Sequence, residues 1–310
     1  MTDAQINPAI LTWALQRSGI GATALAERLG TAASKVSSWE TGERKPTFRQ
    51  ARRMAEIMHI PFGYLYLPEP PEEDLPIADF RTLGDDPVRP LGAAFRDLLN
   101  DVLRKQLWYR EYRQQQGDLP LGFIGRFDLN APAAKIAADI RQTLAITPEE
   151  RSNTQNWEGY LRFLIDRIEA AGILVMRSGI VGNNTHRPLS VDEFRGFVVA
   201  DPYAPVIFIN GKDARAAQIF TLVHELAHIW LGASGVSNER LGDTHYRDAD
   251  VEKICNSTAA EFLVPASELR LRWRGDIDFP TQVRDLTRIF KVSGVVMYPS
   301  AEPVRAVLRG

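Results

Sequence analysis

The sequence predicts a mainly α-helical fold with a small β-sheet (α+β), and three patterns support this prediction. Residues 6 to 67 alternate short amphipathic segments with Gly and Pro, as several short helices would. From 91 to 116 apolar side chains recur at the three-to-four spacing of a helix, at Phe95, Leu98, Leu99, Val102 and Leu107. Between 173 and 210 the pattern changes to short apolar runs separated by Gly, Pro and Asp, which is typical of strands.

Composition limits the class of protein. The chain has 310 residues, 45% of them hydrophobic and 25% charged, so we expect a globular protein of two or three domains. Its formal charge of -2 excludes bulk attraction to polyanions and leaves room only for a local basic face. Cys255 is the single cysteine, which excludes an intrachain disulfide and a multi-thiolate zinc cluster. No segment resembles a secretory signal or a membrane span, so we expect a cytoplasmic protein without a membrane partner.

The positions of Gly and Pro residues divide the chain into three segments. Residues 1–67 form the first domain, and residues 68–150 begin with a Pro-rich acidic run from Pro68 to Pro76 and continue as a helical connector. Residues 151–310 form the last domain and its helical tail. The alternative for the Pro-rich run is a surface loop within one domain rather than a semi-rigid linker.

The remaining elements are expected in the following order. After the helix at 91–116 come helices at 131–144 and 156–171, strands at 173–176, 196–200 and 206–210, helices at 213–231, 248–262 and 282–291, and a strand at Val295–Tyr298. Gly232 directly follows the helix at 213–231 and has the position of a C-cap.

The first domain contains two short helices, 22–30 and 32–40, that are joined by a turn at Thr31. A pair of this kind, with a polar outer face on the second helix, predicts a helix-turn-helix whose second helix enters the major groove of DNA. The candidate DNA contacts on that helix are Ala33, Ser34, Lys35, Ser37 and Ser38, and Arg44, Lys45 and Arg49 follow at positions suited to phosphates.

Local charge favours the same function. Residues 1 to 66 hold eight Lys and Arg against five Asp and Glu, a balance of about +3 that leaves about -5 for the rest of the chain. The alternative is a small helical bundle with ordinary surface charge.

A family resemblance favours DNA binding. Leu25-Ala-Glu-Arg-Leu-Gly30, Lys35-Val-Ser-Ser-Trp-Glu-Thr-Gly42 and Lys45-Pro46 resemble the Cro/CI (Xre) repressor domains over about 60 residues. The resemblance implies a five-helix domain that binds double-stranded operator DNA. Because such modules usually read two half-sites, it also favours a homodimer. Ala32 and Ala33 depart from the family, in which many members carry polar base-contacting residues there.

A metal-binding motif lies in the helix expected at 213–231. His224 and His228 are four residues apart and therefore share one helix face, and Glu225 follows the first histidine. The neighbouring side chains are apolar, so two histidines buried there without a ligand would leave polar groups unsatisfied. The spacing predicts a zinc site with Glu225 as a general base.

Spacing alone leaves several candidates for the third ligand. A metzincin-like continuation needs Gly three residues after His228 and a further His, whereas Gly232 comes at four and the next histidine is His245. Glu252, which lies 24 residues beyond His228 on the next helix, would complete a His-His-Glu site of the gluzincin type. The alternatives are Glu261, Asp248, Asp250 and His245.

A second resemblance addresses this choice. Val206-Ile-Phe-Ile-Asn210, the string from Phe220 to His228, and Glu252-x-x-x-Asn256-x-x-Ala-Ala260-x-x-Leu-Val-Pro265 resemble the ImmA/IrrE family of zinc metallopeptidases over roughly residues 160 to 270. It implies a zincin-like α+β domain that binds Zn²⁺, with Glu252 as the third ligand. Asp79-Phe-Arg-Thr82 and Val292-Ser293 also resemble elements of fused members of this family.

The expected chemistry is peptide hydrolysis by a zinc endopeptidase. Zinc would activate water and polarise the carbonyl, while Glu225 moves the proton. We expect the strand at 206–210 to pair with an extended substrate. His245 and Tyr246 are candidate oxyanion donors, although residues of a surface loop are an equal alternative.

The combined prediction is a DNA-binding transcriptional regulator fused to a zinc endopeptidase. The resemblance implies that its substrate is a regulatory protein in a stress, phage or mobile-element response. The fusion of both domains in one chain adds the hypothesis of self-cleavage near Pro68–Pro76. The first alternative is a non-proteolytic repressor or antitoxin whose zinc domain binds a partner toxin or ligand. The second is a peptidase with a vestigial helix-turn-helix, which would bind no promoter.

Overall fold

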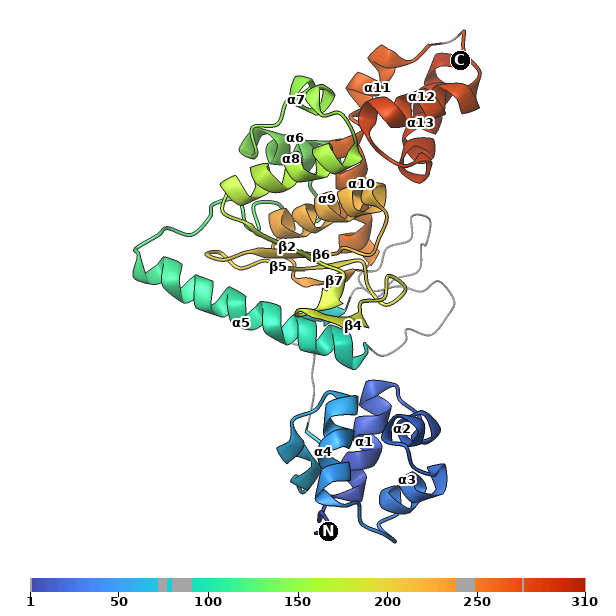
Figure 1. The fold of residues 1–310 in the computed structure, drawn as a ribbon. Helices are drawn as coiled ribbons and strands as arrows, with labels where there is room; N and C mark the ends of the chain where they lie inside the picture. Colours follow the sequence, from blue (N-terminus) through green and yellow to red (C-terminus); the bar gives the residue numbers. More distant parts are fainter. Residues whose placement is uncertain (1, 72–76, 80–90, 238–248, 275, 310) are drawn as a thin grey trace. The chain divides into compact units, whose positions relative to one another are not determined.

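The computed structural model describes residues 2–71, 77–79, 91–237, 249–274 and 276–309, and for 78–79, 249 and 302–309 the backbone alone. These residues form two compact units (Figure 1). The first unit holds the described residues up to 71 and 91–99, and the second holds the others. The predicted class is confirmed, because helices dominate and a small mixed sheet accompanies them.

The first unit consists of four α-helices and one 3-10 helix, α1 Pro8–Ser18, α2 Ala22–Leu29, α3 Ala33–Glu40, α4 Phe48–Met58 and η1 Phe62–Tyr66, and the first turns of α5. Its core is made of apolar side chains from all five short helices, among them Leu11, Leu25, Val36, Met54 and Leu65. Side chains cap the helices: Asn7 accepts the backbone N–H of Ala9, and Thr47 and Gln50 form a capping box at the start of α4.

The second unit is built around a five-stranded sheet of order β1-β7-β5-β6-β2. Its strands are β1 Ala78–Asp79, β2 Leu174–Ser178, β5 Gly196–Val199, β6 Val206–Asn210 and β7 Gly235–Ser237. The pairs β2–β6 and β1–β7 are parallel, and β5 is antiparallel to both β6 and β7. A separate hairpin is formed by β3 Ile180–Val181 and β4 Asn184–Pro188.

Helices bury the sheet and each other. The second unit contains α5 Ala93–Gln115 beyond its first turns, α6 Ala133–Thr143, α7 Pro148–Asn153, α8 Trp157–Ala170, α9 Arg215–Leu231, α10 Ala249–Leu263, α11 Ala266–Arg272, α12 Phe279–Phe290 and α13 Gly294–Arg309. Helix α9 is central: it contacts β5 and β6 on one side and α6, α8 and α10 on others (Figure 1). Fourteen of its residues are buried, as expected for a helix inside a core.

The structure differs from three sequence expectations. Strand β6 pairs with β5 and β2 on its two sides, so the prediction that it pairs with an extended substrate is wrong. Val295–Tyr298 begins the helix α13 instead of forming a strand, and the apolar side chains of Val296 and Met297 pack in the core. Leu107, which the spacing groups with the buried face of α5, is 50% exposed.

Among the helices of the described residues, none has both the length and the apolar character needed to cross a membrane.

Candidate metal centre and nucleic-acid interface

Three buried side chains from two helices converge on one point. His224 and His228 come from successive turns of α9, and their Nε2 atoms lie 3.0 Å apart. The Glu252 carboxylate of α10 contacts each nitrogen with a different oxygen: Oε2 lies 3.2 Å from His224 Nε2, and Oε1 lies 3.2 Å from His228 Nε2. All three residues are at most 2% exposed. Among the described residues, no other group of His, Cys, Asp and Glu side chains has the spacing of a metal site.

The chemistry of this donor set fits a zinc ion. Zinc prefers imidazole nitrogen and carboxylate oxygen at about 2.0–2.2 Å in a tetrahedron, which places neighbouring ligand atoms about 3.3–3.6 Å apart. The 3.0 and 3.2 Å separations of His224, His228 and Glu252 are slightly shorter than this. Two imidazole nitrogens and a carboxylate that face one another in an apolar core are costly unless a cation or proton lies between them.

The electrostatics of the candidate ligands are compatible with a bound cation. Burial of the Glu252 carboxyl acts to raise its pKa, but the neighbouring His224 and His228 outweigh burial and hold this pKa far below its ordinary value. Burial lowers the pKa of His228, against the opposing hydrogen bond with Glu252. An ionised carboxylate and neutral imidazole are the forms that bind metal.

Asn256 orients the first histidine. Its Oδ1 lies 3.0 Å from His224 Nδ1, and with Nε2 turned to the shared point, Nδ1 is the nitrogen that donates the hydrogen bond. Sequence reasoning gave Asn256 no role, although it follows Glu252 by four residues and therefore lies on the same face of α10.

The C-terminal end of α9 is held by a segment that crosses it. Gly125 and Phe127 donate backbone hydrogen bonds to the carbonyls of Ile229 and Trp230, so these two last-turn acceptors have partners. The indole of Trp230 donates to Asp139 of α6 at 2.7 Å. Gly232 has φ of 70° and passes so close to Gly125 that a Cβ would lie 3.1 Å from its Cα, which explains why glycine ends the helix as predicted.

Glu225 lies between α9 and the sheet. Its side chain is fully buried, and an added Cβ on Gly196 of β5 would lie 2.8 Å from Glu225 Oε1 and 2.6 Å from Thr221 Cγ2. Only glycine at position 196 therefore allows α9 to approach the strand this closely.

The C-terminal end of α10 is held by a half-buried arginine. Arg141 of α6 donates to the last-turn carbonyls of Glu261 and Phe262 at 3.0 and 3.2 Å. Helix α10 is thereby fixed against α6 and α9, and this packing places Glu252 opposite the two histidines.

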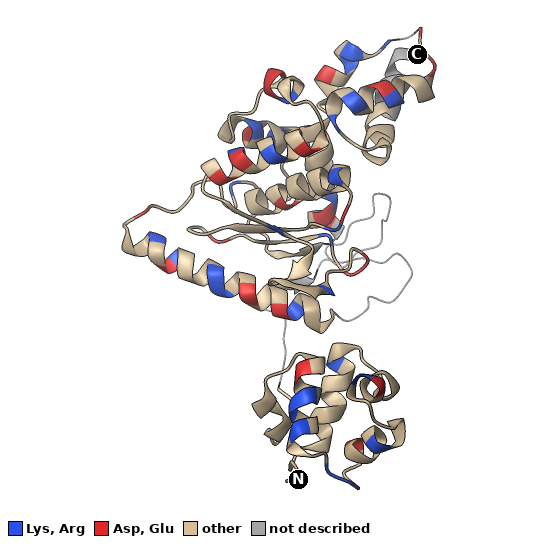
Figure 2. Ribbon diagram, viewed as in Figure 1, with Lys and Arg blue, Asp and Glu red and all other residues tan. Residues whose placement is uncertain are grey.

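The predicted DNA contacts lie on the surface of the first unit. Ala33, Ser34, Lys35 and Ser37 of α3 are exposed, whereas Val36 and Trp39 are buried as expected. The Ser38 hydroxyl is half-buried and donates to the Lys35 carbonyl at 2.7 Å. Arg44 and Lys45 are exposed in the turn before α4. Basic residues are concentrated on α4 in the same unit (Figure 2).

Comparison with known families assigns both units. Residues 14–61 match the model of a helix-turn-helix domain, and residues 168–298 match the model of the IrrE N-terminal-like domain, a metallopeptidase family. The chain joins these two domains. No curated protein matches the chain. The helix-turn-helix match covers α2, α3 and α4, and the IrrE N-terminal-like match covers the whole of α9 and α10, with the candidate metal ligands.

The structure separates two of the alternative ligands, Glu261 and Asp250, from the candidate metal centre of the IrrE N-terminal-like domain. The Glu261 carboxylate accepts the Ala266 N–H at 3.3 Å, and Asp250 is exposed. Asp248 and the candidate oxyanion donors His245 and Tyr246 lie outside the described residues, so their roles stay predictions.

Proposed function

We propose that the protein is a DNA-binding transcriptional regulator whose IrrE N-terminal-like domain is a zinc-dependent endopeptidase acting on a regulatory protein. The observation that supports the enzymatic part is the convergence of His224, His228 and Glu252 within a buried centre, next to the buried Glu225 in the sequence. The matched metallopeptidase family supports the same chemistry.

The chain's own residues have separate roles in this proposal. His224, His228 and Glu252 hold the ion, and Asn256 keeps the His224 ring turned so that its Nε2 lone pair is available. Bound zinc would act as a Lewis acid toward a peptide carbonyl and would make water acidic enough to attack near neutral pH. The Glu225 carboxylate takes a proton from the attacking water and returns it to the leaving amine.

The regulatory part rests on the helix-turn-helix domain. The exposed face of α3 enters the major groove of DNA, where Ser34, Lys35, Ser37 and Ser38 contact base edges. Arg44 and Lys45 contact phosphates of the DNA backbone. Two half-sites would require a homodimer on double-stranded DNA.

The test compares wild type with Glu225→Gln after zinc loading. Both proteins should hold one zinc ion per chain, because Glu225 is not a proposed zinc ligand. Only wild type should cleave the regulatory protein. Each protein is used to capture partners from cells: wild type should yield cut regulator and Glu225→Gln the intact one. A new fragment of the chain itself, present only in wild type, would show that cleavage occurs in cis.

Two results would reject the enzymatic proposal. One is the absence of zinc from both proteins. The other is identical, uncleaved capture of a partner such as a toxin by both, which would favour the non-proteolytic antitoxin.

A further inference from the structure

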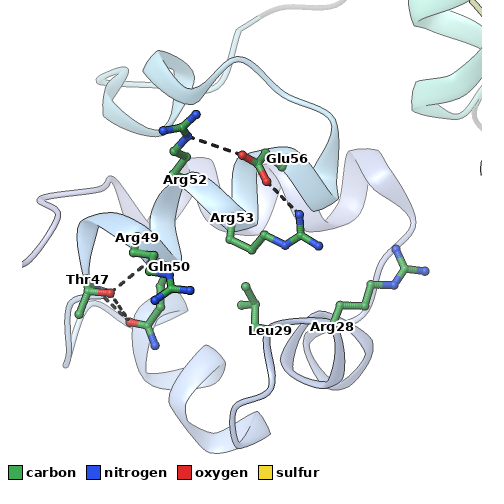
Figure 3. Close-up of a pocket in the computed structure, with 8 residues that line it drawn as sticks. All are labelled: Arg28, Leu29, Thr47, Arg49, Gln50, Arg52, Arg53 and Glu56. Atoms are coloured by element: carbon green, nitrogen blue, oxygen red, sulfur yellow. Dashed lines mark hydrogen bonds and ion pairs between the residues drawn. The ribbon is translucent and has the colours of Figure 1, made fainter. Parts of the chain in front are cut away.

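A hollow of about 560 Å³ lies in the helix-turn-helix domain. Its walls are formed by the C-terminal end of α2 and the exposed side of α4. Figure 3 shows the arginines Arg28, Arg49, Arg52 and Arg53 arranged around it, with Leu29 between Arg28 and Arg49. This set of four is called the arginine hollow below.

The arginine hollow carries a large excess of positive charge. Half of the eight basic residues in 1–66 line it, against the single carboxylate of Glu56. Glu56 is shared by Arg53 at 2.9 Å and Arg52 at 3.6 Å, and these exposed pairs are weak. Arg28 and Arg49 have no ion-pair partner among the described residues. The local charge is about +3 in a chain whose total is -2.

Guanidinium chemistry selects the class of ligand. A planar guanidinium presents paired N–H donors that match two oxygens of a phosphate, and clustered guanidiniums repel one another unless an anion lies between them. The side chains of Thr47, the N-cap of α4, and of Gln50 in its first turn add further polar groups to the lining. A phosphate group is therefore the ligand that this lining favours.

Size and charge narrow the class further. The hollow lies in the range of about 300–1,000 Å³ that small-molecule sites occupy, so it admits more than a bare ion. Phosphodiesters of a DNA backbone carry one charge each and are spread along an extended strand. A net charge of about +3 around a single concavity instead suits a compact ligand that carries several charges on adjacent phosphates.

We propose that the arginine hollow binds a small polyanion with two or more linked phosphate groups, of the nucleoside di- or triphosphate class. This inference is independent of the zinc centre. It differs from the sequence expectation for Arg49, which grouped that residue with Arg44 and Lys45 as a contact to DNA phosphates.

The experiment titrates the full-length protein with inorganic pyrophosphate by calorimetry at constant ionic strength, with inorganic phosphate as the reference ligand. The test variant is the pair Arg28→Gln and Arg49→Gln, which removes the two guanidiniums that lack ion-pair partners. A second pair, Arg28→Lys and Arg49→Lys, keeps the positive charges and removes the paired N–H donors of the two guanidiniums. The control is Arg104→Gln, an exposed arginine of α5 whose side chain is 78% accessible.

We expect pyrophosphate to bind wild type and the control equally, and more tightly than phosphate. The glutamine pair should lose at least about tenfold in affinity, and the lysine pair should lie between them. All the altered side chains are exposed, so circular dichroism should show unchanged folding.

The proposal is overturned if wild type binds pyrophosphate no better than phosphate, or if the glutamine pair binds it as well as wild type. It is also overturned if pyrophosphate fails to bind while the glutamine pair loses affinity for duplex DNA. In that case the arginines serve the DNA backbone.

Discussion

The two domains place their candidate functional groups in opposite environments. The candidate metal centre is buried inside the core of the IrrE N-terminal-like domain, where His224, His228, Glu225 and Glu252 are at most 2% exposed. In the helix-turn-helix domain, the residues with proposed ligands, such as Lys35 and Arg44, are mostly exposed and lie outside the core. The residues of the candidate metal centre are held in place by packing. The residues with proposed DNA or phosphate contacts project from a small helical bundle and are not part of its core.

This difference decides what a substitution costs. In a close-packed interior, a residue that holds a function also holds its neighbours, so changes there should lower stability and function together. Exposed side chains touch few neighbours, so their removal should change binding and leave stability nearly unaltered. Each prediction below tests one side of this contrast.

Removal of the metal should have the largest effect, and it should be confined to one domain. With free zinc at a thousand times its dissociation constant, binding adds about 4 kcal/mol of stability, which a chelator removes. We expect chelation to lower hydrogen-exchange protection in α9 and α10, because both supply ligands. The measurement is hydrogen-exchange mass spectrometry of the intact chain, with zinc re-added as the reversal control.

Amides of α1 to α4 are the internal reference for that experiment. They should exchange at the same rate with and without chelator, since none of the proposed ligands lies in these helices. Equal loss of protection in both domains would contradict the contrast, and so would unchanged protection in α9 and α10.

Gly196→Ala should be the most damaging single methyl group we can add to the centre. The new Cβ would meet Thr221 and Glu225 at 2.6 and 2.8 Å and the Phe208 carbonyl oxygen at 3.1 Å, and the backbone oxygen cannot turn away. Overpacking of this kind costs about 1–3 kcal/mol. Chemical denaturation measures it, with Gly122→Ala as the matched control because no atom lies within 4 Å of its added Cβ. Equal stability of the two variants would show that α9 can move from β5.

Asn256→Leu should weaken zinc binding by about 10- to 100-fold, the usual range for loss of a partner that orients a metal-binding histidine. The variant removes the oxygen that accepts from His224 Nδ1 but fills similar space. Asn256→Asp keeps an acceptor and should bind zinc at least as well as wild type. Competition with a chromophoric chelator gives both affinities. If Asn256→Leu binds as tightly as wild type, packing alone orients the ring.

The local part of the metal site could be predicted from the sequence, because the i, i+4 relation of His224 and His228 depends only on helix geometry. Spacing left Glu252 as one of five candidates for the third ligand, because its position opposite the histidines depends on the packing of α10 against α6 and α9. The roles of Gly196 and Asn256 were missed for the same reason. Contacts between elements far apart in the chain leave no periodic signal.

The fold shows the same boundary between local and long-range information. Most helices and the strands β2, β5 and β6 were predicted near their observed positions, because amphipathic period and Gly or Pro breaks are local. The pairing of β6 on both sides was not, because strand order is set by the tertiary structure. Val295–Tyr298 has β-branched and aromatic residues that favour a strand locally, yet packing of Val296 and Met297 in the core accompanies a helix.

Arg44→Ala should have the smallest effect on stability of the four predictions. The side chain is exposed, and its backbone N–H keeps its hydrogen bond to the Ser38 carbonyl, so the free energy of unfolding should change by less than about 0.5 kcal/mol. Affinity for duplex DNA should nevertheless fall. If Arg44 contacts one phosphate, the slope of log affinity against log salt should become shallower by about 0.9.

Salt titrations of wild type and Arg44→Ala on the same duplex provide the measurement, with Arg104→Gln as the control outside the helix-turn-helix domain. An unchanged slope would remove Arg44 from the DNA contacts. If Arg44→Ala lost as much stability as Gly196→Ala, the contrast between the two domains would fail. The exposed residues proposed to contact DNA would then contribute to stability as the residues of the candidate metal centre do. The contrast between the two domains therefore depends on both measurements, stability and salt dependence, made on the same variant.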